Sequence, residues 1–161
     1  MFLSFLSLYA YFVDSRPVQI LPYMLYSPQK VIQIIVDESK GSNVPTCLVL
    51  AVARVESNFY YRAVSSVGAR GVMQILPKTA REEFGIKARD LWDPRLNIKV
   101  GVMYLYLLYN QYGERWDLAL SHYNGGSLYK KGGVYRIHRY TRGYVRSVYY
   151  WWKNCKRLES S

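Results

Sequence analysis

One glutamate in this sequence, Glu56, is in a position where its carboxyl group could act as a proton donor. Glu56 ends an apolar helix-like run, "AVARVES", in which Ser57 follows it directly. A carboxyl group in such a place loses hydration, which raises its pKa and keeps it protonated nearer to neutral pH. A protonated carboxyl can serve as a general acid, and the Ser57 hydroxyl could hydrogen-bond to it and orient it. The alternative is a solvent-facing glutamate at a helix end, and these residues alone favour that alternative.

Three further motifs place polar side chains near glycines or helix ends. In "GARGVMQ" the glycines would let backbone amides approach a ligand, and Gln74 adds a donor and an acceptor. "HYNGG" places Tyr123 and Asn124 at a helix end, and "TRGYVRSV" contains Tyr144. Each motif also has a structural explanation: a turn, a helix C-cap with Asn and Gly in the left-handed conformation, and a core tyrosine. Taken singly, none of them predicts a function.

The elements that must position these residues are predicted to be helices. Each run has apolar residues at helical spacing, and most runs have a capping residue or proline at the start and a glycine at the end. Asp93 and Asp117 are the expected caps of two of the helices. The expected helices are Ser27-Pro28 to Gly41, "SNVPTCLVLAVARVES", "PKTAREEF", "WDPRLNIKVGVMYLYLLYNQYG", "WDLALSHYNGG" and "TRGYVRSVYYWWKN". No alternating strand of useful length is present, so we predict an all-α class with six or seven helices.

Composition and charge indicate which classes of binding partner the protein could have. The 161 residues fit one domain, and 17 tyrosines suit either a long cleft for sugars or stacked bases, or a tyrosine-rich core. The formal charge is +11, and no Asp or Glu occurs from Leu118 to Leu158. This favours a polyanionic partner: an acidic cell-wall polymer, an anionic membrane surface or a nucleic acid. Nucleic acid is the least favoured, because no recognised binding motif accompanies the charge.

The cysteines and histidines show no metal-like spacing, so we expect no metal and no cofactor. Cys47 and Cys155 are compatible with one long-range disulfide or with two reduced thiols. Residues 1–26 are expected to form an apolar arm outside the fold, either an atypical leader or a membrane-associating segment. Their first apolar run is shorter than the ~20 residues that span a bilayer, and it lacks the basic start of a secretory signal.

Taken together and in this order, the motifs resemble the soluble lytic transglycosylase catalytic domain, of the lysozyme-like superfamily that also contains goose-type lysozymes. The matching blocks are "LVLAVARVESNF", "SSVGARGVMQILPKTA", "DLWDPRLNIKVGVMYL", "ALSHYNGG" and "YTRGYVRSV". The resemblance covers about residue 28 to about residue 153. It implies a helical lysozyme-like fold with a cleft for the glycan strands of peptidoglycan, a monomeric catalytic domain at 27–155 and a tail at 156–161.

The resemblance also implies roles for individual residues. Glu56 would be the sole catalytic carboxylate, protonating the oxygen between N-acetylmuramic acid and N-acetylglucosamine and then acting as base on the muramoyl 6-hydroxyl. The product would carry a 1,6-anhydro ring, with the substrate's N-acetyl group in place of the second carboxylate that most glycosidases use. The remaining residues would contact the substrate or place Glu56: Ser57 and Tyr144 orienting the glutamate, Met73 and Gln74 lining sugar subsites, and Tyr123 and Asn124 holding the acetamido group and neighbouring sugar.

No second carboxylate is expected near Glu56, because the other acidic residues beside the blocks fall in loops, in caps or on a short helix: Glu82, Glu83, Asp90, Asp93 and Asp117. Two residues depart from the family pattern. Tyr140 stands where many relatives carry an acidic residue, and we expect it to loosen a buried network. His122 replaces an alanine, either as an added sugar contact or as a solvent-facing variation, and the variation is favoured.

Two rival functions stay open. A hydrolytic muramidase would use the same site but let water attack, and a non-enzymatic wall- or membrane-binding component would use only the basic surface and the apolar arm. The expected location is the cell envelope, in the periplasm or at the membrane, or a phage virion. The expected role is local opening of the cell wall by a phage particle or an envelope-spanning machine.

Overall fold

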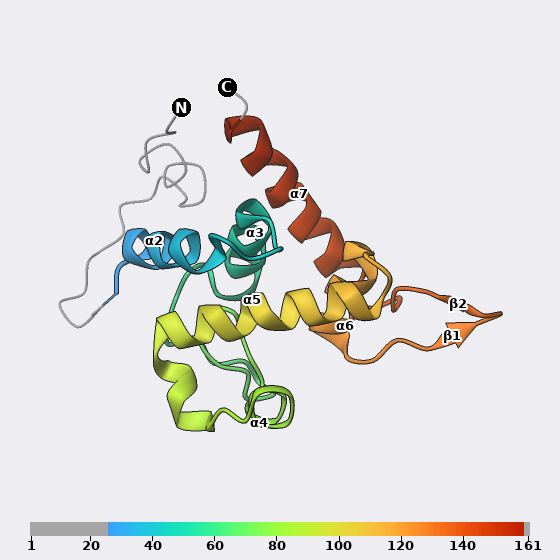
Figure 1. Ribbon diagram of the computed structural model, residues 1–161, viewed down its shortest axis with the longest axis horizontal. Helices are drawn as coiled ribbons and strands as arrows, with labels where there is room; N and C mark the ends of the chain where they lie inside the picture. The colour runs from blue at the N-terminus through green and yellow to red at the C-terminus, as the bar shows by residue number, and fades with distance from the viewer. Residues whose placement is uncertain (1–25, 160–161) are drawn as a thin grey trace.

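The computed structural model describes residues 26–159 of the chain, with side chains through Arg157, and Figure 1 shows their arrangement. The sequence predictions for residues 1–25 lie outside this range. Within it the chain forms α-helices, one 3₁₀ helix and one antiparallel hairpin. The elements are α2 (Pro28–Ser39), α3 (Thr46–Ser57), α4 (Pro77–Phe84), η1 (Ala88–Trp92), α5 (Pro94–Gln111), α6 (Trp116–Gly125), β1 (Lys130–Lys131), β2 (Val134–Tyr135) and α7 (Arg142–Glu159).

The helix starts follow from local chemistry. The Ser27 side chain accepts a hydrogen bond from the backbone N–H of Lys30, and the Asp93 carboxylate accepts one from Leu96 at 2.8 Å. A proline takes the first position of α2, α4 and α5, where its missing N–H costs no hydrogen bond. These starts agree with the boundaries expected from the sequence.

The expected cap at Asp117 is wrong. Arg115 is the residue that precedes α6, and Asp117 lies inside the first turn. The Arg115 guanidinium donates to both carboxylate oxygens of Asp117, at 2.8 and 2.7 Å, and this pairing holds the pKa of Asp117 below its usual range. A carboxylate in the first turn still interacts favourably with the helix dipole, so the residue suits the helix start without capping it.

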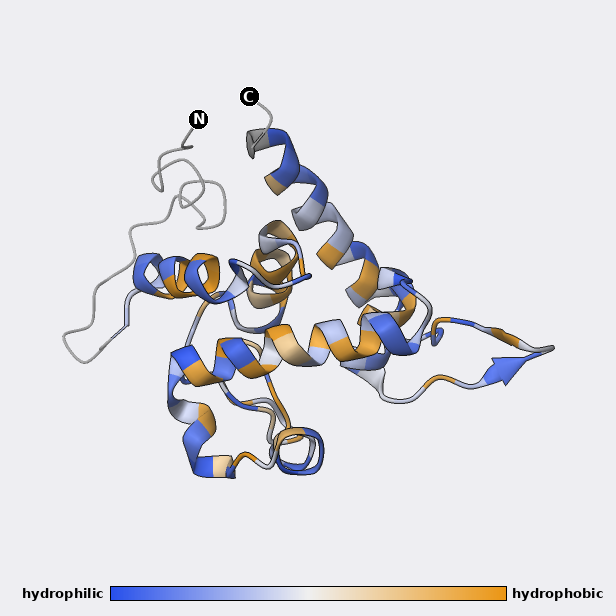
Figure 2. Ribbon diagram, viewed as in Figure 1, coloured by the Kyte–Doolittle hydropathy of each residue, from blue (hydrophilic) through white to orange (hydrophobic). Residues whose placement is uncertain are grey.

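Helix α3 lies at the centre of the core. Its residues from Cys47 to Ala53 are all buried, and it packs against α2 and α7, while α5 packs against α2 and α6. Figure 2 shows the hydrophobic and hydrophilic sides of α2 and α5 that this arrangement requires. A disulfide between Cys47 and Cys155 joins α3 to α7 across 108 residues of sequence, with 5.6 Å between the Cα atoms. Of the two alternatives that the sequence leaves open, the structure contains the disulfide.

The hairpin between α6 and α7 was not expected, because strands of two residues are too short for an alternating pattern. Lys130 lies opposite Tyr135 and Lys131 opposite Val134, and Gly132 and Gly133 form the turn with φ values of 61° and 78°. The hairpin projects from the helical body in Figure 1. Among residues 26–159, no helix is both long enough and apolar enough to cross a membrane.

Candidate active site

Glu56 lies in the last turn of α3, and Asn58, the residue after the helix, has the left-handed conformation with φ of 52°. Burial of the carboxyl raises the pKa of Glu56 to about 7, and the Tyr144 hydroxyl opposes this shift by stabilising the carboxylate. The shift has the direction expected from the apolar helix in the sequence. A carboxyl with this pKa carries its proton in a large fraction of molecules at neutral pH and can still lose it, as a general acid and base must.

Two tyrosines from other helices flank Glu56. Tyr123 comes from α6 and Tyr144 from the first turn of α7, and burial raises the pKa of both phenols well above the ordinary value, with a further contribution from the charge of Glu56. Both hydroxyls therefore stay protonated as donors. The Tyr123 hydroxyl donates to the carbonyl of Met73 at 2.8 Å. The Tyr144 hydroxyl has no partner in strict hydrogen-bond geometry among the described residues, although it lies close enough to Glu56 to lower its pKa.

Ser57 does not orient Glu56 by a direct hydrogen bond, which corrects that prediction. Its hydroxyl points to the loop that follows α3 and lies 2.7 Å from the carbonyl of Val72, with a weaker contact of 3.3 Å to Ala53. The reason is that a serine in the last turn of a helix can reach the carbonyl four residues earlier and a neighbouring segment at once. Ser57 thus fastens the end of α3, and with it Glu56, to residues 71–74.

Met73 and Gln74, both predicted to line sugar subsites, lie in the loop at residues 71–74, but they differ in burial. The Met73 side chain is fully buried and packs against α5, where a Cβ at Gly101 would lie 2.7 Å from the Met73 Cβ. It is thus inaccessible to a sugar, and the backbone carbonyl of Met73 is what supports the site, as the acceptor for Tyr123. Gln74 is half-buried with φ of 48°, and its Nε2 donates to the carbonyls of Ala63 and Gly71. A non-glycine residue in this conformation is often found at functional sites.

Asn97 was missed in the sequence analysis, and it holds this loop in place. It is fully buried on α5, where its Oδ1 accepts from the N–H of Met73 at 2.8 Å. Its Nδ2 donates to the carbonyls of Arg70 and Leu91, at 2.9 and 3.1 Å. The available signal was an asparagine inside an apolar helical stretch, "RLNIKVGV", where a polar side chain needs buried partners.

Replacing Asn97 by alanine is expected to lower the free energy of unfolding by about 3 kcal/mol, because two buried backbone groups and one part-buried carbonyl lose their partners. Chemical denaturation monitored by circular dichroism measures the change. Asn110→Ala is the matched control, since Asn110 is exposed near the end of the same helix. Equal midpoints for the two variants would contradict this role of Asn97.

A cleft of about 450 Å³ brings the exposed site residues together. Three residues predicted to contact substrate line it: Gln74, Tyr123 and Asn124. Glu56 is not a lining residue, but it interacts with Tyr123, which is. No Asp or Glu of the described chain is among its lining residues. The other lining residues are Val67, Ile75, Leu76, Thr79, Tyr104, His122, Gly125, Gly126 and Tyr140.

Residues 33–134 match the model of the transglycosylase SLT domain, and this range is more than half of the chain. The chain belongs to this family. The SLT domain is 36% identical over 95 residues to the soluble lytic murein transglycosylase of Escherichia coli, covering 55% of this chain and 15% of that protein. It is 33% identical over 125 residues to the membrane-bound lytic murein transglycosylase C of Haemophilus influenzae, covering 68% of this chain and 34% of the relative.

Solved structures agree with this assignment. The SLT domain superposes on an inactive glutamate-to-glutamine mutant of the lytic transglycosylase Slt from Pseudomonas aeruginosa with a TM-score of 0.67 and 27% identity, over 80% of this chain and 24% of that chain. The 70 kDa soluble lytic transglycosylase of Escherichia coli gives a TM-score of 0.54 at 27% identity. The prediction of an all-α, lysozyme-like domain is confirmed. The chain spans only 15–34% of the lengths of these relatives.

The two departures from the family pattern take definite positions in this SLT domain. His122 is half-buried in the cleft wall, where its Nδ1 and the Tyr112 hydroxyl are 2.7 Å apart, so the expected solvent-facing variation is wrong. Burial, followed by the charge of His138, lowers the pKa of His122. An imidazole in this setting fits the neutral form, because the apolar surroundings and the second histidine both disfavour its charge.

Tyr140 takes no part in the buried hydrogen bonds of the neighbouring Thr141, and a loosening effect on them stays a prediction. The Tyr140 hydroxyl donates to the carbonyl of Gly125 at 2.8 Å, outside the buried network. In the interior, Ser121 and Thr141 share a hydrogen bond of 2.7 Å, and the backbone N–H of His138 donates to Ser121 at 3.0 Å. These bonds join hydroxyls and backbone groups, and the Thr141 hydroxyl also donates to the carbonyl of His138 at 3.0 Å.

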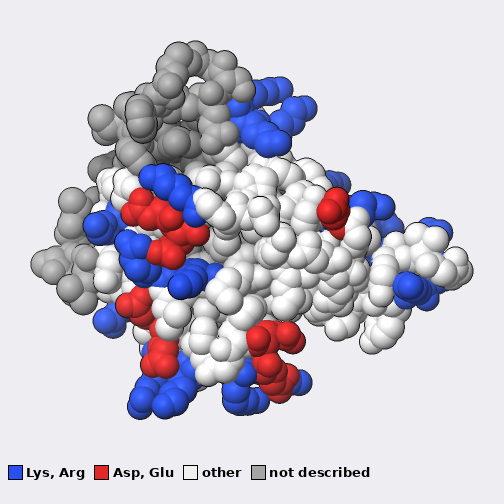
Figure 3. Space-filling view, in the orientation of Figure 1, with Lys and Arg blue, Asp and Glu red and all other residues white. Residues whose placement is uncertain are grey.

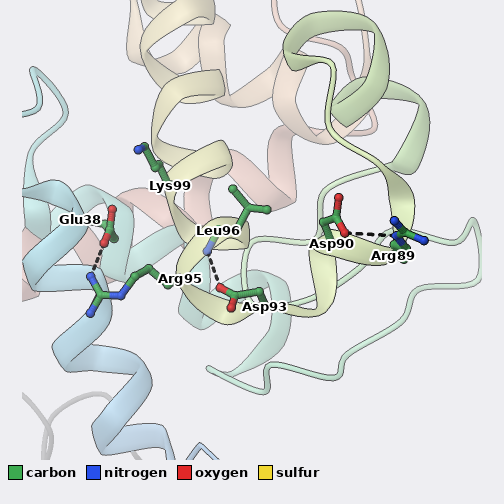
Figure 4. Close-up of a pocket in the computed structure, with 7 residues that line it drawn as sticks. All are labelled: Glu38, Arg89, Asp90, Asp93, Arg95, Leu96 and Lys99. Carbon is green, nitrogen blue, oxygen red and sulfur yellow. Dashed lines mark hydrogen bonds and ion pairs between the residues drawn. The ribbon is translucent and has the colours of Figure 1, made fainter.

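A larger hollow of about 680 Å³ lies over α2, η1 and the start of α5, and its charges compensate one another (Figure 4). Glu38 pairs with Arg95, Arg89 lies 3.5 Å from Asp90, and Asp93 caps α5. Figure 3 shows the corresponding mixture of acidic and basic groups on this side of the domain. These carboxylates lie in surface ion pairs and a helix cap, whereas the Glu56 carboxyl is buried beside the other cleft, so the site around Glu56 is the better candidate for acid–base chemistry.

Proposed function

We propose that this SLT domain is a lytic transglycosylase that cleaves the β-1,4 bond between N-acetylmuramic acid and N-acetylglucosamine in peptidoglycan, with Glu56 as the catalytic acid and base. The observation that carries the proposal is a single carboxyl of raised pKa, about 7, beside a cleft lined by no acidic residue of the described chain. The matched relatives are lytic murein transglycosylases, which supports the same activity here.

In the proposed reaction Glu56 donates its proton to the glycosidic oxygen as the bond to the muramoyl C1 breaks. The Tyr144 hydroxyl, already close to Glu56, stabilises the carboxylate that forms. That carboxylate then takes the proton of the muramoyl 6-hydroxyl, whose oxygen closes on C1 to give the 1,6-anhydro ring. The proton removed in the second step restores Glu56, so the cycle consumes no water and balances without a second carboxylate.

The substrate contacts that we propose follow from the positions in the cleft. Asn124 is exposed on the wall, and Tyr123 lines the cleft and interacts with Glu56, so together they suit the acetamido group and the neighbouring sugar. Gln74 keeps its side-chain oxygen available as an acceptor, since its amide nitrogen is the atom that bonds the loop carbonyls. Met73 and Ser57 do not contact the substrate in this proposal; they stabilise the loop at residues 71–74 and the position of Tyr123.

We place this activity at the cell envelope, as local opening of the wall by a phage particle or an envelope-spanning machine. The basic segment from Leu118 to Leu158 supports this setting, because an acidic wall polymer or membrane surface attracts such a face. Lysis of purified, lipid-free peptidoglycan measured against ionic strength tests the charge contribution. A rate that falls steeply with salt supports it, and a rate independent of salt contradicts it.

The pH profile of the reaction tests the role of Tyr144. Glu56 must be protonated for the first step, so activity is expected to fall as the pH rises through about 7. Tyr144→Phe removes the hydroxyl that stabilises the carboxylate, so the pKa of Glu56 rises and the basic limb of the profile moves to higher pH. Tyr150→Phe, on an exposed part of the same helix, is the control and should leave the limb in place. An unmoved limb in Tyr144→Phe would exclude this role.

A further inference from the structure

The ring of Tyr140 forms an exposed aromatic surface at the edge of the cleft. Tyr140 lines the cleft and is 70% exposed, although its hydroxyl is tied to the carbonyl of Gly125. One side of the ring is stacked on His138, with centroids 4.9 Å apart and planes 13° from parallel. With this exposure, the ring face turned away from His138 is largely open to solvent.

The surroundings of Tyr140 hold the ring in this position. His138 is fixed by its backbone hydrogen bond to Ser121 and by its Nε2, 3.2 Å from the carbonyl of Ser127. A Cβ at position 125 would lie 2.8 Å from a Tyr140 ring carbon, so only glycine allows the ring this close to the end of α6. The platform is therefore preorganised, and a ligand that stacks on it loses little entropy by ordering the protein.

We propose that the open face of Tyr140 is a further sugar-binding subsite, which stacks against the pyranose ring of a glycan residue next to those held by Tyr123 and Asn124. This proposal rests on the proposed function, because it extends the same cleft along the same strand. The face of a pyranose ring presents C–H groups, which pack favourably against the negative face of an aromatic ring.

A sugar fits this surface better than the acidic groups of a peptide stem. The open face of Tyr140 is an aromatic surface, whereas the cations of this part of the chain lie on the hairpin and on the segment leading to α7: Lys130, Lys131, Arg136 and Arg139. Figure 3 shows blue groups and no red ones on the projecting hairpin. Recognition of carboxylates would therefore depend on those cations and would be only weakly sensitive to the loss of the Tyr140 ring.

The test uses the full chain carrying Glu56→Gln, which binds glycan without cleaving it, and isothermal titration with peptide-free oligosaccharides of alternating N-acetylglucosamine and N-acetylmuramic acid. Adding Tyr140→Ala is expected to raise the Kd on the order of 5- to 10-fold, whereas Tyr140→Phe keeps the ring and should change it less than about 2-fold. Tyr150→Ala, 61% exposed on α7 and outside the cleft lining, is the matched control and should leave the Kd unchanged.

Several results would overturn the subsite. These are an unchanged Kd for Tyr140→Ala, an equal loss for Tyr140→Phe and Tyr140→Ala, or a loss seen only with peptide-bearing strands, which would mean that the surface reads stem peptides. Thermal melting of each variant shows whether the fold is kept, and Tyr140→Phe provides the ring-retaining comparison if Tyr140→Ala is unstable. If the Glu56→Gln parent binds no glycan at all, the proposed function fails together with the subsite. Normal binding by the parent with an unaffected Tyr140→Ala refutes the subsite alone.

Discussion

Glu56→Gln is expected to lower the rate of peptidoglycan cleavage by about 10²- to 10⁴-fold, with little change in glycan affinity. Glutamine keeps the size and hydrogen-bonding capacity of the side chain but has no proton to give to the glycosidic oxygen. No acidic residue of the described chain lines the adjoining cleft, so no neighbouring carboxylate is positioned to compensate. Glu83→Gln, on the exposed surface of α4, is the matched control and should retain full activity.

The same substitution should stabilise the fold at alkaline pH. The pKa of Glu56 is about 7 in the folded protein and 4.5 for an unperturbed carboxyl, so its contribution to stability is complete below about 4.5 and is lost as the pH rises through 7. Glutamine carries no such penalty, and at pH 9 the variant should be more stable than the parent by up to ~3 kcal/mol. Urea unfolding at pH 5 and pH 9 measures this difference. A parent whose stability relative to Glu56→Gln is the same at both pH values would contradict the buried position of the carboxyl.

Loss of the Cys47–Cys155 disulfide has the second-largest expected effect, a decrease of about 2–5 kcal/mol in the free energy of unfolding. The bond closes a long loop, with a sequence separation of 108 residues, and a long loop restricts the unfolded chain strongly. Cys47→Ala/Cys155→Ala should lower the denaturation midpoint in oxidising buffer. Treating the parent with a reductant should lower its midpoint by a similar amount.

The disulfide should also matter for catalysis. Cys47 and Glu56 stand near opposite ends of α3, and Cys155 and Tyr144 stand near opposite ends of α7. The bond therefore joins the two antiparallel helices at one end, while Tyr144 meets Glu56 at the other. We expect the double variant to lose part of its activity below its melting temperature.

Identical denaturation midpoints for the parent with and without reductant would show that the disulfide contributes nothing to stability.

Local chemistry in the sequence was sufficient for most of the fold. Helix starts depend on residues close in sequence: the side chains of Ser27 and Asp93 accept hydrogen bonds from backbone N–H groups three residues later, and prolines follow them. These boundaries can therefore be predicted from the local sequence. Asp117 was misassigned because Arg115, two residues earlier, takes its carboxylate in an ion pair. The hairpin is too short to produce a pattern at all.

The sequence identified most residues of the site, but it did not predict which groups they contact. Glu56, Gln74, Tyr123 and Asn124 gather as the motifs indicated, since each belongs to a recognisable block. The partner of Ser57 and the burial of Met73 depend on contacts between segments far apart in the chain, such as the bond from Asn97 on α5 to the Met73 loop. Tyr144 was predicted from the block "YTRGYVRSV", and the packing of α7 on α3 is what brings it beside Glu56.

The most direct test of the account is mass spectrometry of the glycan ends that the chain produces from purified peptidoglycan. Proton donation and removal by Glu56 alone predicts ends with 1,6-anhydro-muramic acid, lighter by one water than reducing ends, in the parent and in Glu83→Gln. These ends should be nearly absent in Glu56→Gln. Reducing ends in the parent would mean that water attacks instead, and anhydro ends that persist in Glu56→Gln would show that another group performs the chemistry.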